Sequence, residues 1–369
     1  MKAARFYGPG DVRVEDIPEP EAKVGQLKVK IAWNGICGSD LHAYLTKVPQ
    51  YATSDTINPV TGEKAPVTLG HEFSGTVVGL GEGVDANHWK VGQNVVIEPL
   101  VSCQKHSTCA ACAVGTRNLC PLAAFIGVGG WGGGLSEYIA VDTRYVHILP
   151  DGVPLEIGAM IEPLAVAYYS VKRSGFTKGQ TALIVGGGPI GLFILKVLRS
   201  IDTSNMVIVS EPASGRRELA SKHGATMVLN PLETLIDGKP SATALGAAVY
   251  DATKGVGVDV AFDAAGIQAG LDAALLSLRP RGTLVNVAIW EKDPISISMN
   301  LITGRELNVT GIMAYTGVHP ELIEAVAAGK IRNLEELITR KISIDDVVEK
   351  GILSLLKDKD SQVKILVHP

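Results

Sequence analysis

Short segments that read as strands occupy the first 150 residues. Residues 27–33 alternate between hydrophobic and polar side chains, residues 75–81 do so less regularly, and residues 91–97 are a further candidate strand. A period of two is typical of strands with one buried face. Because glycines and prolines separate these segments, the pattern predicts a twisted, mostly antiparallel β domain.

The pattern changes after Pro163. Apolar strands alternate there with stretches of helical periodicity at residues 190–198 and 214–223. The candidate strands are residues 181–185, 206–210, 226–229, 259–263 and 282–289. This alternation predicts a doubly wound parallel sheet with helices on both faces.

The tail ends in a candidate strand, residues 362–368, which we expect to return to the first domain. The sequence therefore predicts an α/β chain of two domains. The first comprises residues 1–160 and 320–369, and the second comprises residues 161–319.

Composition and charge exclude several classes of partner. The formal net charge is −4 and no basic run stands out, which argues against nucleic acid or an anionic membrane surface. The chain has neither an apolar run of membrane-spanning length nor an apolar signal-peptide core. All five cysteines lie between Cys37 and Cys120, and an odd, clustered set favours reduced, metal-binding thiols. We therefore expect a cytoplasmic protein.

A glycine-rich turn follows the candidate strand at residues 181–185. Its residues, Gly186-Gly-Gly-Pro-Ile-Gly191, match a dinucleotide fingerprint in the expected strand–turn–helix context. Gly186 makes the tight turn, Gly188 lets the backbone approach a pyrophosphate, and Gly191 lets the helix pack closely. The helix that begins near Pro189 and Ile190 then offers free N–H groups to the phosphates.

Glu211 lies about 20 residues beyond Gly191, at the tip of the next strand. A carboxylate there accepts the ribose hydroxyls and repels a 2′-phosphate, so NAD is the expected cofactor. Arg216 and Arg217 follow closely and leave NADP open, and Arg216 is a further candidate cofactor-binding residue. The alternative interpretation of Glu211 is a solvated loop carboxylate.

Cys37 and His71 are candidate ligands of a catalytic metal ion. They are too far apart in the sequence for one local finger, but they can be two sides of an open zinc site, with Glu72 and Glu162 as candidate third ligands. The alternatives are a buried cysteine and a core histidine. Zinc together with a hydride carrier indicates alcohol–ketone redox chemistry.

Two polar residues close to Cys37 are candidates for the proton path. Ser39 and His42 supply a hydroxyl and an imidazole that could carry the proton released by the alcohol to solvent. The alternative interpretations are a turn hydroxyl and a surface side chain.

A second group of thiols predicts a structural zinc lobe at about residues 98–122. Its candidate ligands are Cys103, Cys109, Cys112 and Cys120. Because five residues separate the first two cysteines, His106 is an alternative to Cys103 as a ligand. A chance grouping of buried thiols is the remaining interpretation.

The chain resembles the zinc-dependent medium-chain dehydrogenases over essentially its whole length. The motifs that carry the resemblance occur in the family's order: Gly35-Ile-Cys-Gly-Ser-Asp-Leu-His42, Leu69-Gly-His-Glu-Phe-Ser-Gly75, the four-cysteine lobe, Glu162-Pro163 and the glycine fingerprint. The resemblance implies a GroES-like catalytic domain, a Rossmann cofactor domain, one catalytic and one structural zinc, and a homodimer or homotetramer. It also implies that Cys37, His71, Glu72 and Glu162 surround the catalytic zinc, with the two glutamates exchanging as ligands, and that Ser39 and His42 relay protons.

Within this family the chain is most similar to the 2,3-butanediol dehydrogenases, through Trp33, Tyr44 and residues 58–71. The chain departs from the pattern of its branch at Tyr168-Tyr169, at Ala43 and in the cysteine loop. A more aromatic, less charged pocket mouth favours small diols or hydroxyketones as substrates. The resemblance therefore implies NAD-dependent interconversion of 2,3-butanediol and acetoin, with the (R,R) isomer as the expected substrate. The alternatives are a polyol dehydrogenase of the sorbitol or xylitol type and a non-catalytic nicotinamide-binding protein.

Overall fold

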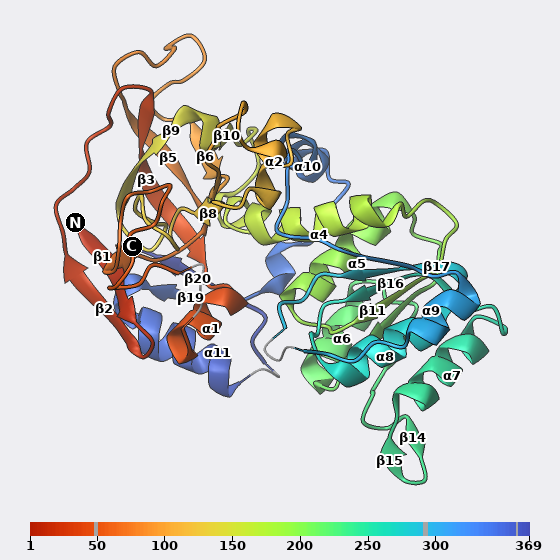
Figure 1. The fold of residues 1–369 in the computed structure, drawn as a ribbon. Helices are drawn as coiled ribbons and strands as arrows, with labels where there is room; N and C mark the ends of the chain where they lie inside the picture. The colour runs from red at the N-terminus through yellow and green to blue at the C-terminus, as the bar shows by residue number, and fades with distance from the viewer. Residues whose placement is uncertain (48–50, 291–293, 359–360) are drawn as a thin grey trace. The chain divides into compact units, whose positions relative to one another are not determined.

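The computed structural model describes residues 1–47, 51–290, 294–358 and 361–369 (Figure 1). The chain divides into two compact units: unit 1 comprises Met1–Pro163 and Thr316–Pro369, and unit 2 comprises Leu164–Tyr315. The expected boundaries lay three residues earlier at the first junction and four residues later at the second. Within the described ranges, none of the helices has the length and hydropathy needed to cross a bilayer.

Unit 1 is built on a mixed sheet with the strand order β10-β6-β5-β3-β20-β19, in which β9 also pairs with β3. Its strands are β3 (Gln26–Gly35), β5 (Glu72–Leu80), β6 (Asn94–Ile97), β9 (Tyr138–Asp142), β10 (Val146–Ile148), β19 (Ile338–Ser343) and β20 (Lys364–His368). The pairs are antiparallel except β19 with β20. The prediction of a mostly antiparallel domain is therefore confirmed, with one parallel pair added by the tail.

Two smaller sheets complete the strands of unit 1. Strands β1, β2 and β4 form the first, and β7 pairs with β8 in the second. Their bounds are β1 (Lys2–Gly8), β2 (Asp11–Asp16), β4 (Val67–Thr68), β7 (Leu100–Val101) and β8 (Ala124–Phe125).

The alternating pattern of β3 explains its place within the sheet. Leu27, Val29 and Ile31 are buried and pack in one hydrophobic cluster with Phe73 and Val77 of β5. Burial of each such side chain contributes about 1.5–3 kcal/mol. The lysines between them lie on the other face of the pleat. This packing holds β3 and β5 side by side, so that the end of β3 and the start of β5 lie beside the candidate metal site.

The helices of unit 1 are short and lie mostly at strand ends. They are α1 (Gly38–Leu45), α2 (Ala110–Ala113), η1 (Arg117–Leu119), η2 (Thr143–Tyr145), α3 (Leu155–Gly158), α10 (His319–Ala327), η3 (Glu335–Leu337), η4 (Ile344–Asp346), η5 (Val347–Ile352) and α11 (Leu353–Lys357). Helix α4 (Ile161–Ser174) begins in unit 1 and continues into unit 2. Strand β20 pairs antiparallel with β3, where Leu366 lies opposite Gly35. The tail therefore returns to the first unit.

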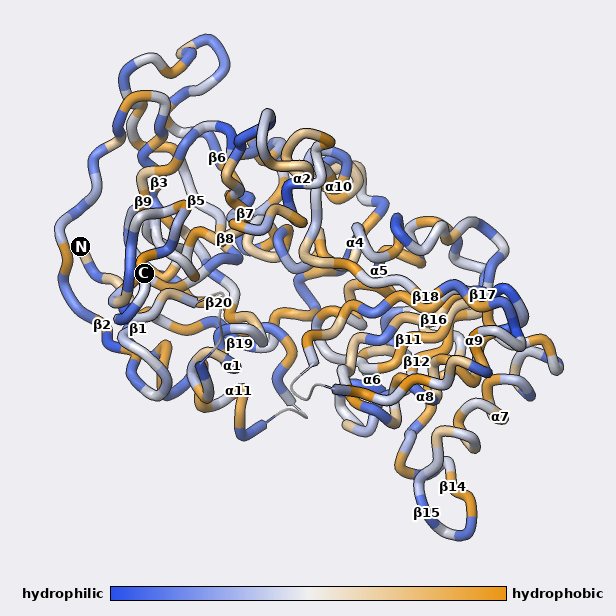
Figure 2. Tube along the Cα trace, viewed as in Figure 1, coloured by the Kyte–Doolittle hydropathy of each residue, from blue (hydrophilic) through white to orange (hydrophobic). Residues whose placement is uncertain are grey.

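Unit 2 is a parallel sheet with the order β13-β12-β11-β16-β17-β18. Its strands are β11 (Ala182–Val185), β12 (Val207–Ser210), β13 (Met227–Leu229), β16 (Val258–Asp263), β17 (Leu278–Asn286) and β18 (Asn308–Gly311). Its helices are α5 (Pro189–Ile201), α6 (Ser214–Lys222), α7 (Ala242–Ala252), α8 (Gln268–Ser277) and α9 (Met299–Arg305). Hydrophobic segments run along the central strands β11, β12 and β16 (Figure 2). The predicted doubly wound sheet is confirmed.

Two features of unit 2 differ from the sequence prediction. Strand β17 runs from Leu278 to Asn286, although the apolar run predicted residues 282–289. The chain leaves the sheet after Asn286 because the amides of Val287 and Ala288 donate to the carbonyl oxygen of Asp263. A short hairpin of β14 (Leu235–Ile236) and β15 (Lys239–Pro240) was not predicted, since its strands are exposed and carry no apolar periodicity.

Candidate active site

The ends of neighbouring strands bring Cys37, His71 and Glu72 together in unit 1. Cys37 follows β3 and caps α1, while His71 and Glu72 lie where β5 begins, and Gly35 pairs with Glu72 across the two strands. One ligand atom from each of the three residues lies within 4.8 Å of the others. Sulfur, imidazole nitrogen and carboxylate oxygen are the donor atoms that zinc prefers.

The imidazole of His71 is oriented by a buried carboxylate. Its Nδ1 lies 3.5 Å from Oδ1 of Asp40, and its Nε2 lies 3.3 Å from Oγ of Ser39. The hydroxyl of Tyr51 donates to Oδ1 of Asp40 at 2.8 Å, and the amide of Cys37 donates to Oδ2 at 3.0 Å. A carboxylate facing one ring nitrogen of a histidine is the usual support for metal binding at the other.

Burial and charge act against each other on His71. Burial opposes the imidazolium, but the negative charges of Asp40 and Cys37 outweigh it and hold the pKa of His71 well above its usual value. The same negative charges attract a metal cation. The residues therefore fit a divalent ion bound to neutral His71, which must release its proton when the ion binds.

Glu72 is paired with a lysine from the C-terminal strand. Nζ of Lys364 lies 2.9 Å from Oε1 and 2.6 Å from Oε2 of Glu72, and it donates to the carbonyl oxygen of Ile36 at 3.2 Å. Both side chains are almost completely buried. Burial lowers the pKa of Lys364, but Glu72 and Cys37 outweigh that effect and raise it. Lys364 thus brings a permanent positive charge to the group.

Glu162 lies in the first turn of α4 and is buried. Its negative charge contributes to the raised pKa of both His71 and Lys364. Within the described part of the chain, however, the set of atoms that lie within 4.8 Å comprises Cys37, His71 and Glu72 without Glu162.

Ser39 and His42 lie on α1, one helical turn apart. The hydroxyl oxygen of Tyr51 lies 3.4 Å from Oγ of Ser39, and the same Oγ faces His71. His42 is half-buried. The structure therefore places the Ser39 hydroxyl beside the group of metal-ligand atoms, with His42 one turn further along α1.

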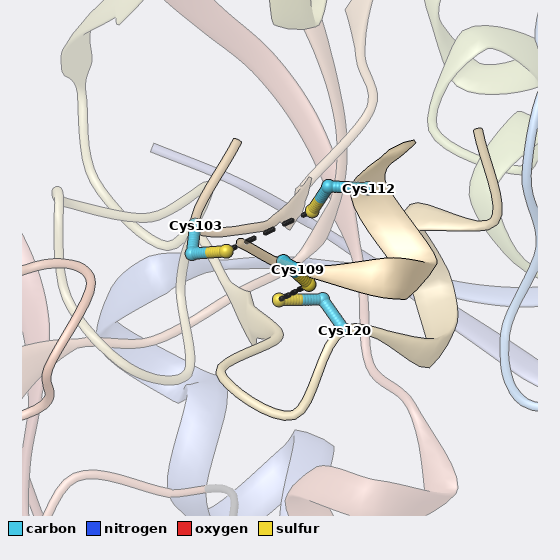
Figure 3. A group of neighbouring side chains, drawn as sticks. All are labelled: Cys103, Cys109, Cys112 and Cys120. Carbon is cyan, nitrogen blue, oxygen red and sulfur yellow. Dashed lines mark hydrogen bonds between the residues drawn. The ribbon is translucent and has the colours of Figure 1, made fainter. Parts of the chain in front are cut away.

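The four remaining cysteines converge in a loop of unit 1 (Figure 3). The sulfurs of Cys103 and Cys112 are 3.8 Å apart, those of Cys109 and Cys120 are 3.9 Å apart, and all four lie within 4.8 Å of one another. His106 is exposed, and its Nδ1 contacts the carbonyl oxygen of Cys112 at 2.9 Å. The geometry groups Cys103 with the other three thiols and leaves His106 outside the group.

The glycine-rich turn in unit 2 has the backbone that the fingerprint requires. Gly186 follows β11 and has a φ of +99°, and Gly188 caps α5, whose first residue is Pro189. A Cβ atom at Gly191 would overlap the carbonyl oxygen of Gly186. Because the order of strands reverses between β11 and β16, this turn lies at the switch point where such sheets bind ligands.

Glu211 is buried and braces this turn. Its Oε2 accepts a hydrogen bond from the amide of Gly187 at 2.6 Å, and its Oε1 accepts one from the amide of Ala213 at 2.8 Å. Arg217 donates to the carbonyl oxygen of Glu211 at 3.1 Å. Nη1 of the Arg216 guanidinium lies 3.5 Å from the position that a Cβ atom would take at Gly188. Glu211 is therefore not a solvated loop carboxylate.

Comparison with known proteins is consistent with both sites. Residues 23–151 match the alcohol dehydrogenase GroES-like domain, and residues 189–328 match the zinc-binding dehydrogenase family. The (R,R)-butanediol dehydrogenase of Neisseria gonorrhoeae is 41% identical over 100% of this chain and 99% of that protein. The chain belongs to the zinc-dependent alcohol dehydrogenase family. Members of this family combine a GroES-like domain with a Rossmann-type domain, as unit 1 and unit 2 do.

Two further relatives, one a solved structure, are also similar to this chain over its full length. The crystal structure of 2R,3R-butanediol dehydrogenase from Bacillus subtilis has a TM-score of 0.90 and 39% identity, covering 100% of this chain and 99% of that chain. The sorbitol dehydrogenase of Bacillus subtilis is 32% identical over 100% of this chain and 97% of that protein.

Three residues of the candidate active site were missed by sequence reasoning. Asp40 stands inside the cysteine motif, so its place between Cys37 and His71 was a usable signal. Tyr51 and Lys364 had no such signal, because neither belongs to a motif and each meets the site only through the fold.

Proposed function

We propose that this chain is an NAD-dependent zinc alcohol dehydrogenase that interconverts 2,3-butanediol and acetoin. The observation that carries the proposal is the convergence of Cys37, His71 and Glu72 on one point of a family member whose relatives include butanediol dehydrogenases. Three ligands of these types match a catalytic zinc site, which keeps a position for substrate.

The proposed ligands of the catalytic zinc are Cys37 and His71, with Glu72 or Glu162 as the third. A zinc ion held by these residues would act as a Lewis acid towards the substrate hydroxyl and would lower its pKa. Asp40 keeps the His71 ring in register through its contact with Nδ1. Glu72 lies among the converging ligand atoms, although both of its carboxylate oxygens also contact Nζ of Lys364.

The proposed proton path begins at Ser39. Its hydroxyl oxygen lies 3.3 Å from Nε2 of His71, one of the proposed ligand residues. From Ser39 the proton passes to His42, one turn further along α1, and then to solvent.

The proposed structural zinc is held by Cys103, Cys109, Cys112 and Cys120. Four convergent thiolates match a closed tetrahedral site, and the contact of His106 with a backbone carbonyl supports Cys103 as the fourth ligand.

The proposed cofactor is NAD, held by Gly186, Gly188, Pro189, Ile190 and Gly191 at the turn. Glu211 supports NAD, because a buried carboxylate beside the turn disfavours a 2′-phosphate, while Arg216 lies close by.

The proposed substrate class is a small vicinal diol or hydroxyketone. The aromatic pair Tyr168-Tyr169 supports this choice over long sugar alcohols, whereas Ala43 is buried in a hydrophobic cluster of unit 1. A polyol dehydrogenase remains the second candidate, because the sorbitol dehydrogenase of Bacillus subtilis is also a full-length relative. A homodimer or homotetramer and a cytoplasmic location stay predictions of the sequence.

The test is a substrate panel with chiral product analysis. We expect the highest kcat/KM on (R,R)-2,3-butanediol with NAD, and lower values on sorbitol, xylitol and threonine and with NADP. A better rate on sorbitol would transfer the assignment to the polyol class. A protein that bound zinc and NADH without turnover would be the non-catalytic alternative.

A second measurement tests the metal. We expect Cys37→Ser to abolish turnover while leaving dinucleotide binding largely intact. Full activity after a chelator has removed all zinc would contradict the mechanism.

A further inference from the structure

A third group of metal-ligating side chains lies in unit 1 and shares no residue with the two zinc sites proposed above. Glu98 follows β6, His147 lies in β10, and His319 is the first residue of α10. One ligand atom from each of these three residues lies within 4.8 Å of the others. We call these three residues the Glu98 cluster.

The Glu98 cluster converges on one carboxylate oxygen. Oε2 of Glu98 lies 2.9 Å from Nε2 of His147 and 3.6 Å from Nδ1 of His319. The two imidazole rings are stacked, with centroids 5.0 Å apart and planes inclined by 12°. Arg117 pairs with the other oxygen, Oε1. Oε2 and the two ring nitrogens therefore form a compact set of one oxygen and two nitrogen donors.

The protonation states of the cluster suit metal binding. Burial opposes the charged form of Glu98, but hydrogen bonding from His147 and the charges of its neighbours hold its pKa at about 2. Burial lowers the pKa of His319 to about 3. A carboxylate and a neutral imidazole are the forms that ligate metal ions, and the proton on Nε2 of His147 must leave when an ion binds there.

A groove in unit 1 gives access to the cluster. A cavity of about 390 Å³ is lined by His147 of the cluster and, among others, by His88, Trp89, Pro320 and Ile323. His147 is half-buried, whereas Glu98 and His319 lie behind it and are almost fully buried. A metal site needs an entry path of this kind.

We propose that Glu98, His147 and His319 form a further binding site for a divalent cation of the zinc class. Two imidazoles and one carboxylate are a donor set typical of zinc, and three protein ligands leave a coordination position for water. Because Arg117 occupies Oε1, Glu98 binds the ion through Oε2 alone. The positive charge of Arg117 also weakens the site, so a chelator should remove this ion before it removes the ion held by the four thiolates.

The test counts zinc ions bound to the full-length protein by native mass spectrometry, with zinc chloride as the probe. We expect wild-type protein in zinc-supplemented buffer to hold one zinc ion more per chain than His319→Gln or His147→Gln. His88→Gln is the matched control, because it removes an exposed histidine from the same groove without touching the cluster. It should keep the wild-type count.

Two results would overturn the proposal. Equal counts in wild-type, His147→Gln and His319→Gln protein would mean that the cluster is a metal-free ionic network. Loss of the ion in His88→Gln would place it on the groove surface. Circular dichroism and NADH turnover check folding, and if His319→Gln does not fold, the partly exposed His147→Gln carries the test. This experiment is independent of the proposed function, because the ion in question is lost only in variants of the Glu98 cluster.

Discussion

At the scale of single residues, the contact between Glu72 and Lys364 governs the electrostatics of the metal site. Both groups are almost fully buried, and their charges have no bulk water to screen them. Removal of one member of a buried ion pair leaves an uncompensated charge, which commonly costs about 3–5 kcal/mol. Lys364 is therefore a stabilising residue as well as a neighbour of the proposed zinc ligands.

We expect Lys364→Met to lower the free energy of unfolding by about 3 kcal/mol, because it leaves the Glu72 carboxylate buried and unpaired. Urea unfolding measures this change. The double variant Lys364→Met with Glu72→Gln should recover part of the loss, since both charges are then absent. An unchanged unfolding curve for the single variant would show that water reaches Glu72 and compensates its charge.

We expect Asp40→Asn to weaken zinc binding at the catalytic site about 10–100-fold, because an amide orients His71 less strongly than a carboxylate. Competition with a zinc-binding dye measures the affinity. Asp16→Asn, at an exposed position on β2, is the control. A wild-type affinity in Asp40→Asn would mean that packing alone holds the His71 ring.

Sequence reasoning found most of the site residues that belong to motifs, but it overlooked Asp40 inside one motif and missed Tyr51 and Lys364, which belong to none. Cys37 and His71 could be found because each lies in a short, specific pattern next to a predicted strand. Lys364 could not be found, because it lies 292 positions from Glu72 and only the pairing of β20 with β3 brings the two together. Such long-range contacts depend on strand order, which local periodicity does not encode.

At the scale of elements, the Glu98 cluster joins β6, β10 and α10 and makes their packing sensitive to acid. The charged or titratable groups that face His319 are Glu98, His147 and Arg117. The pKa of His319 is about 3 in the folded protein, against an ordinary value of 6.5. Below pH 6.5 the unfolded chain binds a proton on this histidine, whereas the folded protein does not. The folded state therefore loses stability relative to the unfolded chain as the pH falls from 6.5 towards 3.

We expect the free energy of unfolding to fall by about 1 kcal/mol per pH unit below pH 6.5 through this histidine. His319→Gln should reduce that slope, because a glutamine does not titrate. Urea unfolding at pH 7, 6 and 5 without added zinc measures the slope. If wild-type and His319→Gln protein lost stability in parallel, His319 would not be the titrating group.

The turn between β11 and α5 leads to a different prediction. We expect Gly191→Ala to weaken NADH binding at least about 10-fold, because the added methyl group displaces the carbonyl of Gly186 and with it the phosphate-facing turn. Fluorescence titration with NADH measures the affinity. Gly304→Ala in α9 is the matched control, since its Cβ would enter open space. Equal affinities in the two variants would contradict the assigned role of the turn.

Elements with strong periodicity were predictable, and elements set by distant contacts were not. The apolar runs of β11, β12 and β16 gave their positions to within a residue, because a strand buried on both faces must be apolar throughout. The end of β17 was misplaced, because hydrogen bonds to Asp263 divert a run that is still apolar in sequence. The hairpin of β14 and β15 left no hydrophobic signal at all.

At the scale of the whole molecule, unit 1 is assembled from two separate stretches of chain. Strand β20 lies between β3 and β19, so its absence would open the sheet and remove Lys364. Unit 2 has its own parallel sheet and hydrophobic core, with none of its strands drawn from the tail.

We expect a chain that stops at residue 361 to lose the cooperative unfolding of unit 1 and its catalytic zinc, while unit 2 still binds NADH. Thermal unfolding by circular dichroism, zinc content and NADH fluorescence test this together. Removal of Pro369 alone is the control, because that residue lies beyond β20. Wild-type melting of the shortened chain would mean that the sheet closes without β20.

The return of the tail to β3 has a consequence for biosynthesis. A ribosome makes the protein from its N-terminus, so all of unit 2 emerges before the strand that pairs with β3. Until Lys364 has been synthesised, Cys37, His71 and Glu72 therefore lack the positive charge that pairs with Glu72 in the folded protein. The proposed metal site is therefore completed only after Lys364 has been synthesised, and until then the N-terminal part of unit 1 is exposed to chaperones and proteases.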